Sequence, residues 1–167
     1  MKREDVVSLV PAGSICLELG VAQGEFADLV LSKYPVVLYG IDRWSDHHND
    51  REYKNTLDRL SKFGDRSIII RKTFEEAVHD FEDGFFDLIY IDGYAHTGQE
   101  NGRTLRDWYP KLKSGGIFSG DDYSKKYPQT ISAVDRFLSE YNLELHLTDE
   151  IGESIWSKSH TWYTTKL

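Results

Sequence analysis

Acidic residues follow two of the most apolar segments of this chain. Asp92 comes directly after residues 85–91, and Asp121 and Asp122 follow the apolar segment 116–119 with one glycine between. If these segments are neighbouring parallel strands, their ends lie about 4.8 Å apart at one edge of the sheet. Three converging carboxylates need a cation, and such an oxygen-only set suits Mg²⁺ or Mn²⁺. We therefore predict a divalent metal on Asp92, Asp121 and Asp122 that activates a substrate hydroxyl, with helix capping by Asp121 or Asp122 as the alternative.

A histidine near this acidic set is the candidate general base. His96 lies just past Asp92 in a loop expected at the same edge, where it could take a proton from an attacking hydroxyl. Asp92 and His96 are therefore the predicted catalytic residues, although His96 could simply hydrogen-bond its own loop. His47 and His48 fall in a segment without an apolar pattern and are expected at the surface, in a region that could contribute to a lid.

A glycine-containing turn follows the first apolar segment, residues 14–19. Gly20 permits a sharp turn, while Ala22 and Gly24 keep bulky side chains away from a bound ligand. The spacing differs from the Gly-x-Gly-x-x-Gly turn that binds dinucleotides. Asp42 ends the second apolar segment and could accept hydrogen bonds from both hydroxyls of a ribose.

The charges beside this turn narrow the class of ligand. Glu18 and Asp42 would repel a pyrophosphate, but they suit a ligand with a ribose, an amino group and a sulfonium charge. S-adenosylmethionine is such a ligand. The alternative is that Asp42 caps the following segment and Glu18 is only an edge residue.

The elements that must position these residues alternate along the chain. Apolar segments recur with amphipathic segments between them, which predicts a parallel sheet wound with helices. The predicted strands are residues 14–19, 36–41, 67–71, 85–91 and 116–119, and the predicted helices are residues 23–33, 50–62, 74–81, 98–112 and 130–141. Residues 143–147 and 155–157, continued by 161–164, predict an antiparallel hairpin at the sheet edge. The expected fold is therefore α/β, Rossmann-like and doubly wound, with a mostly parallel seven-stranded sheet.

Composition limits the other possibilities. The 167 residues, 40% of them hydrophobic, predict one globular domain over residues 1–167. A net charge of -8 disfavours nucleic acid and anionic membrane surfaces as partners. Cys16 is the single cysteine, and we expect neither a secretory segment nor an apolar run of about 20 residues that could span a membrane. The cytoplasm is the expected location.

Four segments of the chain resemble the class I S-adenosylmethionine-dependent methyltransferases. Within that class they are similar to the metal-dependent small-molecule and sugar O-methyltransferases, over about residues 14–141. The most specific segment is a helix end of the form Leu-Lys-x-Gly-Gly that leads into an apolar strand and an acidic pair. The four segments are residues 17–24, 41–42, 86–93 and 108–123.

The resemblance implies roles for individual residues. Asp92, Asp121 and Asp122 match the metal positions of the metal-dependent relatives, and residues 73–75 would lie beside the adenine of the cofactor. The full set predicted to bind the cofactor is Glu18, Gly20, Ala22, Gly24, Phe26, Asp42, Arg43, Thr73, Phe74 and Asp92.

Two departures from the family pattern affect these expectations. Ala95 stands where catechol-type relatives have a lysine base, so the assignment of the base rests on His96. Relatives also have an N-terminal helical extension that roofs the substrate site, and we do not expect one here. We therefore expect an open site, suited to a larger glycan or to a lid from a partner subunit in a homo-oligomer.

These observations predict an S-adenosylmethionine-dependent O-methyltransferase that acts, with a divalent metal, on a hydroxyl of a sugar, a glycan or a small polyol. One alternative is a metal-independent methyltransferase acting on nitrogen or on a phenol. Another is a cofactor-binding subunit without catalysis. The loops that would select the acceptor, residues 44–49 and 124–128, have no pattern that identifies it.

Overall fold

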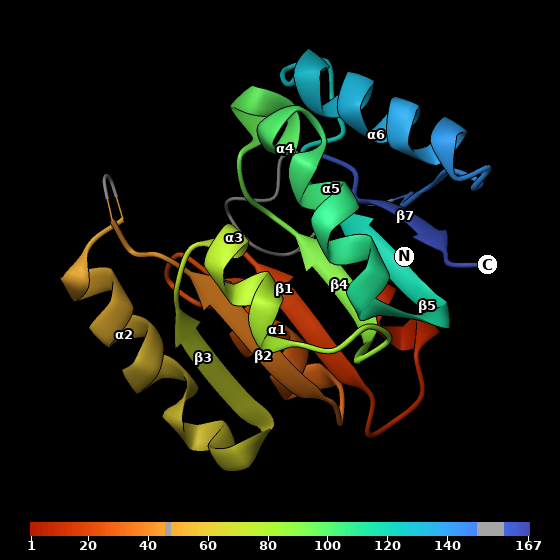
Figure 1. Cartoon of the computed structure of the whole chain (residues 1–167). Helices are drawn as coiled ribbons and strands as arrows, with labels where there is room; N and C mark the ends of the chain where they lie inside the picture. Colours follow the sequence, from red (N-terminus) through yellow and green to blue (C-terminus); the bar gives the residue numbers. More distant parts are fainter. Residues whose placement is uncertain (46–47, 150–158) are drawn as a thin grey trace.

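The computed structural model describes residues 1–45, 48–149 and 159–167. Its seven strands form one sheet in the order β3-β2-β1-β4-β5-β7-β6 (Figure 1). The first five strands are parallel, and β7 runs antiparallel to both β5 and β6, so the predicted fold class is confirmed. The strands are β1 (Ile15–Leu19), β2 (Val37–Asp42), β3 (Ser67–Arg71), β4 (Phe86–Ile91), β5 (Leu112–Gly120), β6 (His146–Leu147) and β7 (Trp162–Thr165).

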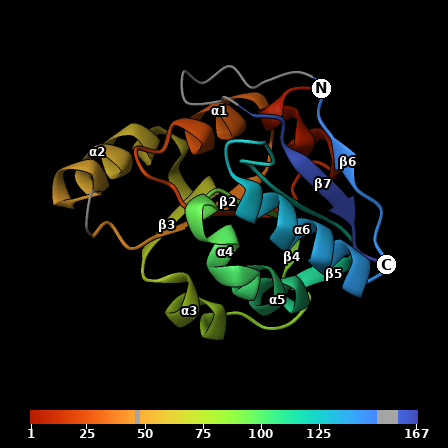
Figure 2. The ribbon, with the colours of Figure 1, turned by 90° about the horizontal axis from the view of Figure 1, so that it is seen from above.

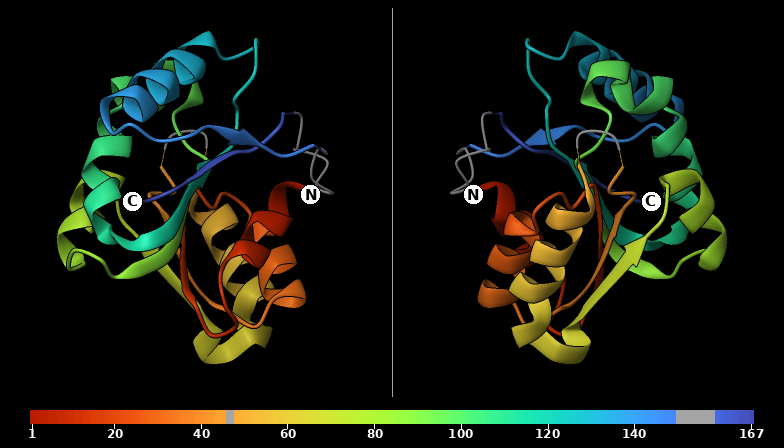
Figure 3. Two further views of the ribbon diagram at one scale, coloured as in Figure 1. Left: turned by 90° about the vertical axis from the view of Figure 1, so that its right-hand side faces the viewer. Right: turned by 90° about the vertical axis from the view of Figure 1, so that its left-hand side faces the viewer.

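Helices cover both faces of this sheet (Figures 2 and 3). The 3-10 helix η1 (Arg3–Leu9), α1 (Glu25–Lys33) and α2 (Asp50–Leu60) pack on one face. On the other face lie α3 (Phe74–Ala77), α5 (Arg103–Trp108) and α6 (Pro128–Glu140). Because both faces of the central strands are buried, these strands are almost continuously apolar. The remaining helical segments are η2 (Ser61–Arg66), η3 (Val78–Asp80), η4 (Ala95–Thr97), α4 (Gly98–Asn101) and η5 (Tyr109–Lys111).

Backbone hydrogen bonds continue the sheet register just past the strand ends. The amide of Gly20 donates to the carbonyl of Ile41 at 2.9 Å, and that of Asp92 donates to Leu19 at 2.7 Å. The amide of Asp121 donates to Ile91 at 3.0 Å. The first residues after β1, β4 and β5 are therefore held side by side where the strand order reverses, which is where open α/β sheets bind ligands.

The single helix predicted for residues 98–112 is wrong. Gly98 and Gly102 both have positive φ, at +60° and +77°, and the segment breaks into α4, α5 and η5. Gly102 separates α4 from α5, and Pro110 lies in η5, where the last helical turn tightens before β5. Strand β5 also begins at Leu112, earlier than predicted.

The chain ends differ from the predictions in two ways. The 3-10 helix η1 was not expected from the sequence, and it packs against α1 through Val6 and Val7. The hairpin partner of β6 is β7, which matches the predicted continuation at 161–164, while residues 155–157 lie outside the described residues. Within the described ranges, no helix is long and apolar enough to cross a membrane.

Candidate functional site

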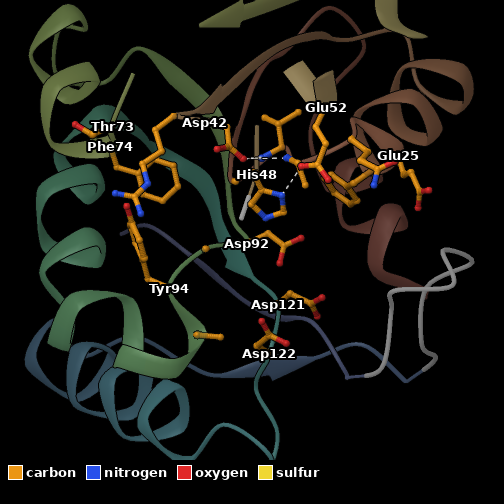
Figure 4. A pocket seen from close by; sticks show the side chains of 18 of the residues that line it. Glu25, Asp42, His48, Glu52, Thr73, Phe74, Asp92, Tyr94, Asp121 and Asp122 are labelled. Atoms are coloured by element: carbon orange, nitrogen blue, oxygen red, sulfur yellow. Dashed lines mark hydrogen bonds and ion pairs between the residues drawn. The ribbon is translucent and has the colours of Figure 1, made fainter. Parts of the chain in front are cut away.

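A pocket of about 720 Å³ opens at the carboxyl ends of β1, β2, β4 and β5. Figure 4 shows Asp92, Asp121 and Asp122 bordering one part of it, with Thr73, Phe74 and Tyr94 bordering another. The predicted site residues that line the pocket are Gly20, Ala22, Phe26, Asp42, Arg43, Thr73, Phe74, Asp92, His96, Asp121 and Asp122. Most of the predicted site residues therefore lie around one pocket, although Glu18 and Gly24 are not part of its lining.

The glycines of the first turn serve packing as much as ligand access. A Cβ at Gly20, whose φ is +96°, would lie 2.2 Å from the carbonyl oxygen of Asp92, so this turn needs glycine to approach β4. A Cβ at Gly24 would instead lie 3.1 Å from a methyl carbon of Thr56 in α2. Gly24 is thus a contact between helices at the start of α1, and its predicted role beside the ligand is corrected.

Asp42 is already engaged by the backbone. Its Oδ2 accepts hydrogen bonds from the amides of Val21 (3.0 Å) and Ala22 (2.9 Å), and its Oδ1 accepts one from Trp44 (3.0 Å). A carboxylate has about four acceptor positions, so one is left for a ligand hydroxyl rather than the two predicted for a ribose. The same bonds occupy two amides that a pyrophosphate would need in this turn.

Strained backbone gathers at this pocket. Ala22, Tyr94 and Asp122 line it with positive φ values of 48°, 59° and 61°. Trp44, at φ 44°, lies behind the turn and donates from Nε1 to the carbonyl of Ala22 at 2.8 Å. Thr56 donates to the same carbonyl at 2.8 Å. Such conformations persist where the surroundings enforce them, and they cluster at ligand sites.

An aromatic wall borders the pocket beside the ends of β3 and β4. Phe74 and Tyr94 meet edge to face with ring centroids 5.3 Å apart. Thr73 caps the start of α3, because its hydroxyl accepts a hydrogen bond from the amide of Glu76 at 3.2 Å. A Cβ at Gly93 would lie 2.8 Å from the Phe74 ring, so the ring packs directly on the backbone after Asp92. This wall suits a flat apolar group such as a purine ring.

The carboxylates after β4 and β5 converge as predicted, but their counter-ion is an arginine. Arg3 donates from Nη1 to Asp121 at 3.0 Å and from Nη2 to Asp92. The guanidinium also lies over the rings of Phe26 (4.7 Å) and Tyr90 (5.2 Å). The Arg3 side chain is only 6% exposed, so these pairs are largely shielded from water.

Burial changes the protonation of the acidic groups here. It raises the pKa of Glu18 well above its usual value, Asp92 and Asp42 add to that effect, and Arg3 opposes it. Burial likewise raises the pKa of Asp121 to about 7 and that of Asp122 to about 6, and Arg3 lowers both. Glu18 is 1% exposed and outside the pocket lining, so direct contact with the cofactor does not fit its position.

The predicted metal site does not fit the residues as they lie. Among residues 1–45, 48–149 and 159–167, no group of three His, Cys, Asp or Glu side chains is arranged to hold a metal ion. One oxygen each of Asp92 and Asp121 accepts from Arg3, which leaves Asp122 as the one carboxylate of the predicted set that Arg3 does not engage. A guanidinium therefore supplies the positive charge that the converging carboxylates require.

Two histidines line the pocket. His96 is exposed, and its ring meets that of Tyr127 edge to face at 5.1 Å. His48, predicted at the surface, also lines the pocket, and its Nδ1 lies 2.7 Å from Glu52 Oε2. The spacing of four residues at the start of a predicted helix could have indicated this pair. His47 lies outside the described residues.

Comparisons with known proteins point to one family. The profile of a family described as a methyltransferase domain matches residues 17–123. The uncharacterized protein y4gI of Sinorhizobium fredii (strain NBRC 101917 / NGR234) is 29% identical over 102 residues, which are 61% of this chain and 11% of that protein. This chain thus spans only a small part of that relative.

Solved structures share the fold, and two of them show the extent of the likeness. A SAM-dependent O-methyltransferase from Thermotoga maritima superposes with a TM-score of 0.71 at 13% identity, covering 98% of this chain and 64% of that one. An O-methyltransferase from Bacillus cereus in complex with SAH gives a TM-score of 0.72 at 11% identity, covering 98% and 79%. At these identities the likeness establishes the fold.

Proposed function

The chain belongs to the methyltransferase domain family, and from that premise we propose that it transfers a methyl group from S-adenosylmethionine to a hydroxyl of a sugar, a glycan or a small polyol. The position of the pocket and the charges that line it favour one class of cofactor. The pocket lies at the reversal of strand order, it is lined by acidic residues, and the amides of its first turn are occupied by Asp42. This arrangement favours a cationic adenosyl ligand over a dinucleotide.

The residues present fit S-adenosylmethionine in three places. Asp42 retains one acceptor position for a ribose hydroxyl, and Phe74 with Tyr94 offers an aromatic face to the adenine. Asp92 supplies negative charge where the sulfonium and amino groups would lie. When bound, S-adenosylmethionine supplies a methyl carbon activated by the positive sulfur.

His96 is the proposed general base. An aliphatic hydroxyl is a poor nucleophile at neutral pH, and an exposed imidazole in the pocket can relieve this limit by accepting its proton. His96 takes that proton as the acceptor oxygen bonds to the methyl carbon and the carbon–sulfur bond breaks, which leaves S-adenosylhomocysteine. Tyr127, which contacts the His96 ring, gives the acceptor a flat surface to lie on.

The acceptor class rests on two arguments. The solved structures named above that share this fold are described as O-methyltransferases, which favours oxygen over nitrogen. A net charge of -8 favours a neutral or cationic small molecule or glycan over nucleic acid. Metal assistance, part of the prediction from sequence, enters no step here because Arg3 engages two of the three carboxylates.

The test combines binding with transfer. Titration calorimetry with S-adenosylhomocysteine and with NAD should show binding of the first alone. Labelled S-adenosylmethionine, offered with sugars, polyols, catechols and amines, should then label a sugar or polyol. Transfer only to amines or catechols would overturn the acceptor assignment, and cofactor binding with no transfer would show a non-catalytic subunit. Binding of NAD instead would overturn the proposal as a whole.

A further inference from the structure

A buried arginine far from the strand ends in sequence completes the acidic part of the pocket. Arg3 precedes its partners Asp92 and Asp121 by 89 and 118 residues. Each of its two terminal nitrogens bonds a carboxylate from a different strand end. The planar guanidinium therefore bridges the ends of β4 and β5 in the way that a shared metal ion would.

The 3-10 helix η1, which contains Arg3, is held in place by packing and by hydrogen bonds. Val6 and Val7 are buried against α1. Asp5 accepts the amide of Lys2 at 3.0 Å and the hydroxyl of Tyr34 at 2.7 Å. Packing and hydrogen bonds thus fix where the arginine enters the pocket.

The surroundings of the guanidinium are built for a permanent cation. The rings of Phe26 and Tyr90 stack with centroids 4.3 Å apart, and Arg3 lies over both. A weakly hydrated guanidinium can lie on these two aromatic faces, whereas a divalent ion that keeps its water ligands is poorly suited to an apolar surface. Asp92 and Asp121 hold Arg3 in its charged form against the effect of burial, which alone would lower the pKa of the guanidinium.

We propose that Arg3 is the resident cation of this site, which offsets one of the two negative charges of Asp92 and Asp121 and positions Asp92 beside the cofactor, so that cofactor binding and methyl transfer need no divalent metal ion. The part that concerns the cofactor rests on the proposed function. Arg3 acts through Asp92 and is therefore a positioning residue. From the sequence we predicted a divalent metal ion between these carboxylates; the proposed cation is instead the guanidinium of Arg3.

The first test measures metal binding to the protein without cofactor. Electron paramagnetic resonance with Mn²⁺ alone should show no bound ion in the wild type or in Arg103→Met. Arg103 is a matched control, because it also pairs with two carboxylates, Glu75 and Asp107, but is 54% exposed. Stoichiometric Mn²⁺ in the wild type that is lost in Asp121→Asn would overturn the proposal.

The second test measures cofactor affinity by calorimetry with S-adenosylhomocysteine. Wild-type affinity should be the same in chelator and in Mg²⁺, and a threefold or larger gain in Mg²⁺ would overturn the proposal. Arg3→Met should bind about 10-fold more weakly, because it leaves buried carboxylates without a partner. Arg3→Lys keeps the positive charge but cannot bond both carboxylates through a planar guanidinium. Its affinity for S-adenosylhomocysteine should therefore lie between that of the wild type and that of Arg3→Met.

A double variant separates charge neutralisation from simple folding. If Arg3 acts by neutralising its partners, Arg3→Met combined with Asp121→Asn should recover affinity to within about threefold of the wild type. A double variant no better than Arg3→Met would overturn the proposal. If the wild type binds no S-adenosylhomocysteine, the proposed function fails, while the Mn²⁺ measurement still decides whether Arg3 excludes metal.

Discussion

Replacing Gly20 with alanine tests how closely the first turn must approach β4. The added Cβ would lie 2.2 Å from the carbonyl oxygen and 2.8 Å from the carbonyl carbon of Asp92. These are backbone atoms held by the bond from the Asp92 amide to Leu19, so they cannot swing aside as a flexible side chain can. Either the turn or the end of β4 must shift, and the site shifts with it.

Gly13 provides a matched control for the backbone strain. Its φ is +82°, close to the +96° of Gly20, but a Cβ there meets nothing within 4 Å. Alanine at positive φ costs about 1–2 kcal/mol, and the stiffer unfolded chain offsets about 0.4–1 kcal/mol of this. Gly13→Ala should therefore lower the free energy of unfolding by about 1 kcal/mol.

Gly20→Ala carries the same strain plus a steric term. Overpacking against fixed atoms typically costs about 1–3 kcal/mol, so the loss should reach about 2–4 kcal/mol. Urea titrations followed by tryptophan fluorescence measure both variants, and S-adenosylhomocysteine affinity should fall only in Gly20→Ala. Equal losses in the two variants, within about 0.5 kcal/mol, would refute the close approach as the reason for glycine at this position.

Three further outcomes follow from the buried core and the pocket. Burial raises the pKa of the Cys16 thiol to about 12, so labelling of this thiol at pH 8 should require unfolding. S-adenosylhomocysteine at 100 times its Kd stabilises the folded state and should slow the labelling about 100-fold. An unchanged labelling rate would argue against binding to the folded state. His96→Gln should lower kcat by a factor of about 10²–10⁴ without changing cofactor affinity, because it removes the base. His79→Gln, an exposed control outside the pocket, should do neither, and full activity in His96→Gln would remove His96 from the mechanism. Asp92→Asn should weaken S-adenosylmethionine about 10-fold more than it weakens S-adenosylhomocysteine, since only the first carries a sulfonium charge, with exposed Asp83→Asn as the control; equal effects on both ligands would show that Asp92 does not face the sulfur.

The strand ends were predictable because burial and chemistry coincide there. Residues 85–91 are almost all apolar, which predicts a strand covered on both faces, and β4 spans Phe86–Ile91. A carboxylate directly after such a strand must lie at the sheet edge, whatever the loops do. The meeting of Asp92 with Asp121 therefore followed from strand order.

Arg3 could not be found in the same way. Its helix has seven residues, too few to show a helical period, and nothing local ties it to partners about a hundred residues away. Only the uncompensated acidic cluster signalled that a cation was needed. A cluster of carboxylates alone does not distinguish a metal ion from a guanidinium.

Two other errors had signals that were outweighed. Strand alternation places Glu18 with Cys16, on the face of the sheet that η1, α1 and α2 cover, opposite the face of Leu17 and Leu19. Its side chain therefore lies under these helices and outside the pocket lining. For residues 98–112, the helical spacing of apolar residues dominated, although two glycines four residues apart marked the break.

The most direct test of the account is a crystal structure of the protein with S-adenosylhomocysteine. Density for the adenosyl group should lie against Gly20 and Phe74, with one ribose hydroxyl on Asp42 and the sulfur facing Asp92, and the Arg3 ion pairs should be retained. Clear ligand density elsewhere on the protein, or none in this pocket at saturating ligand, would contradict the account.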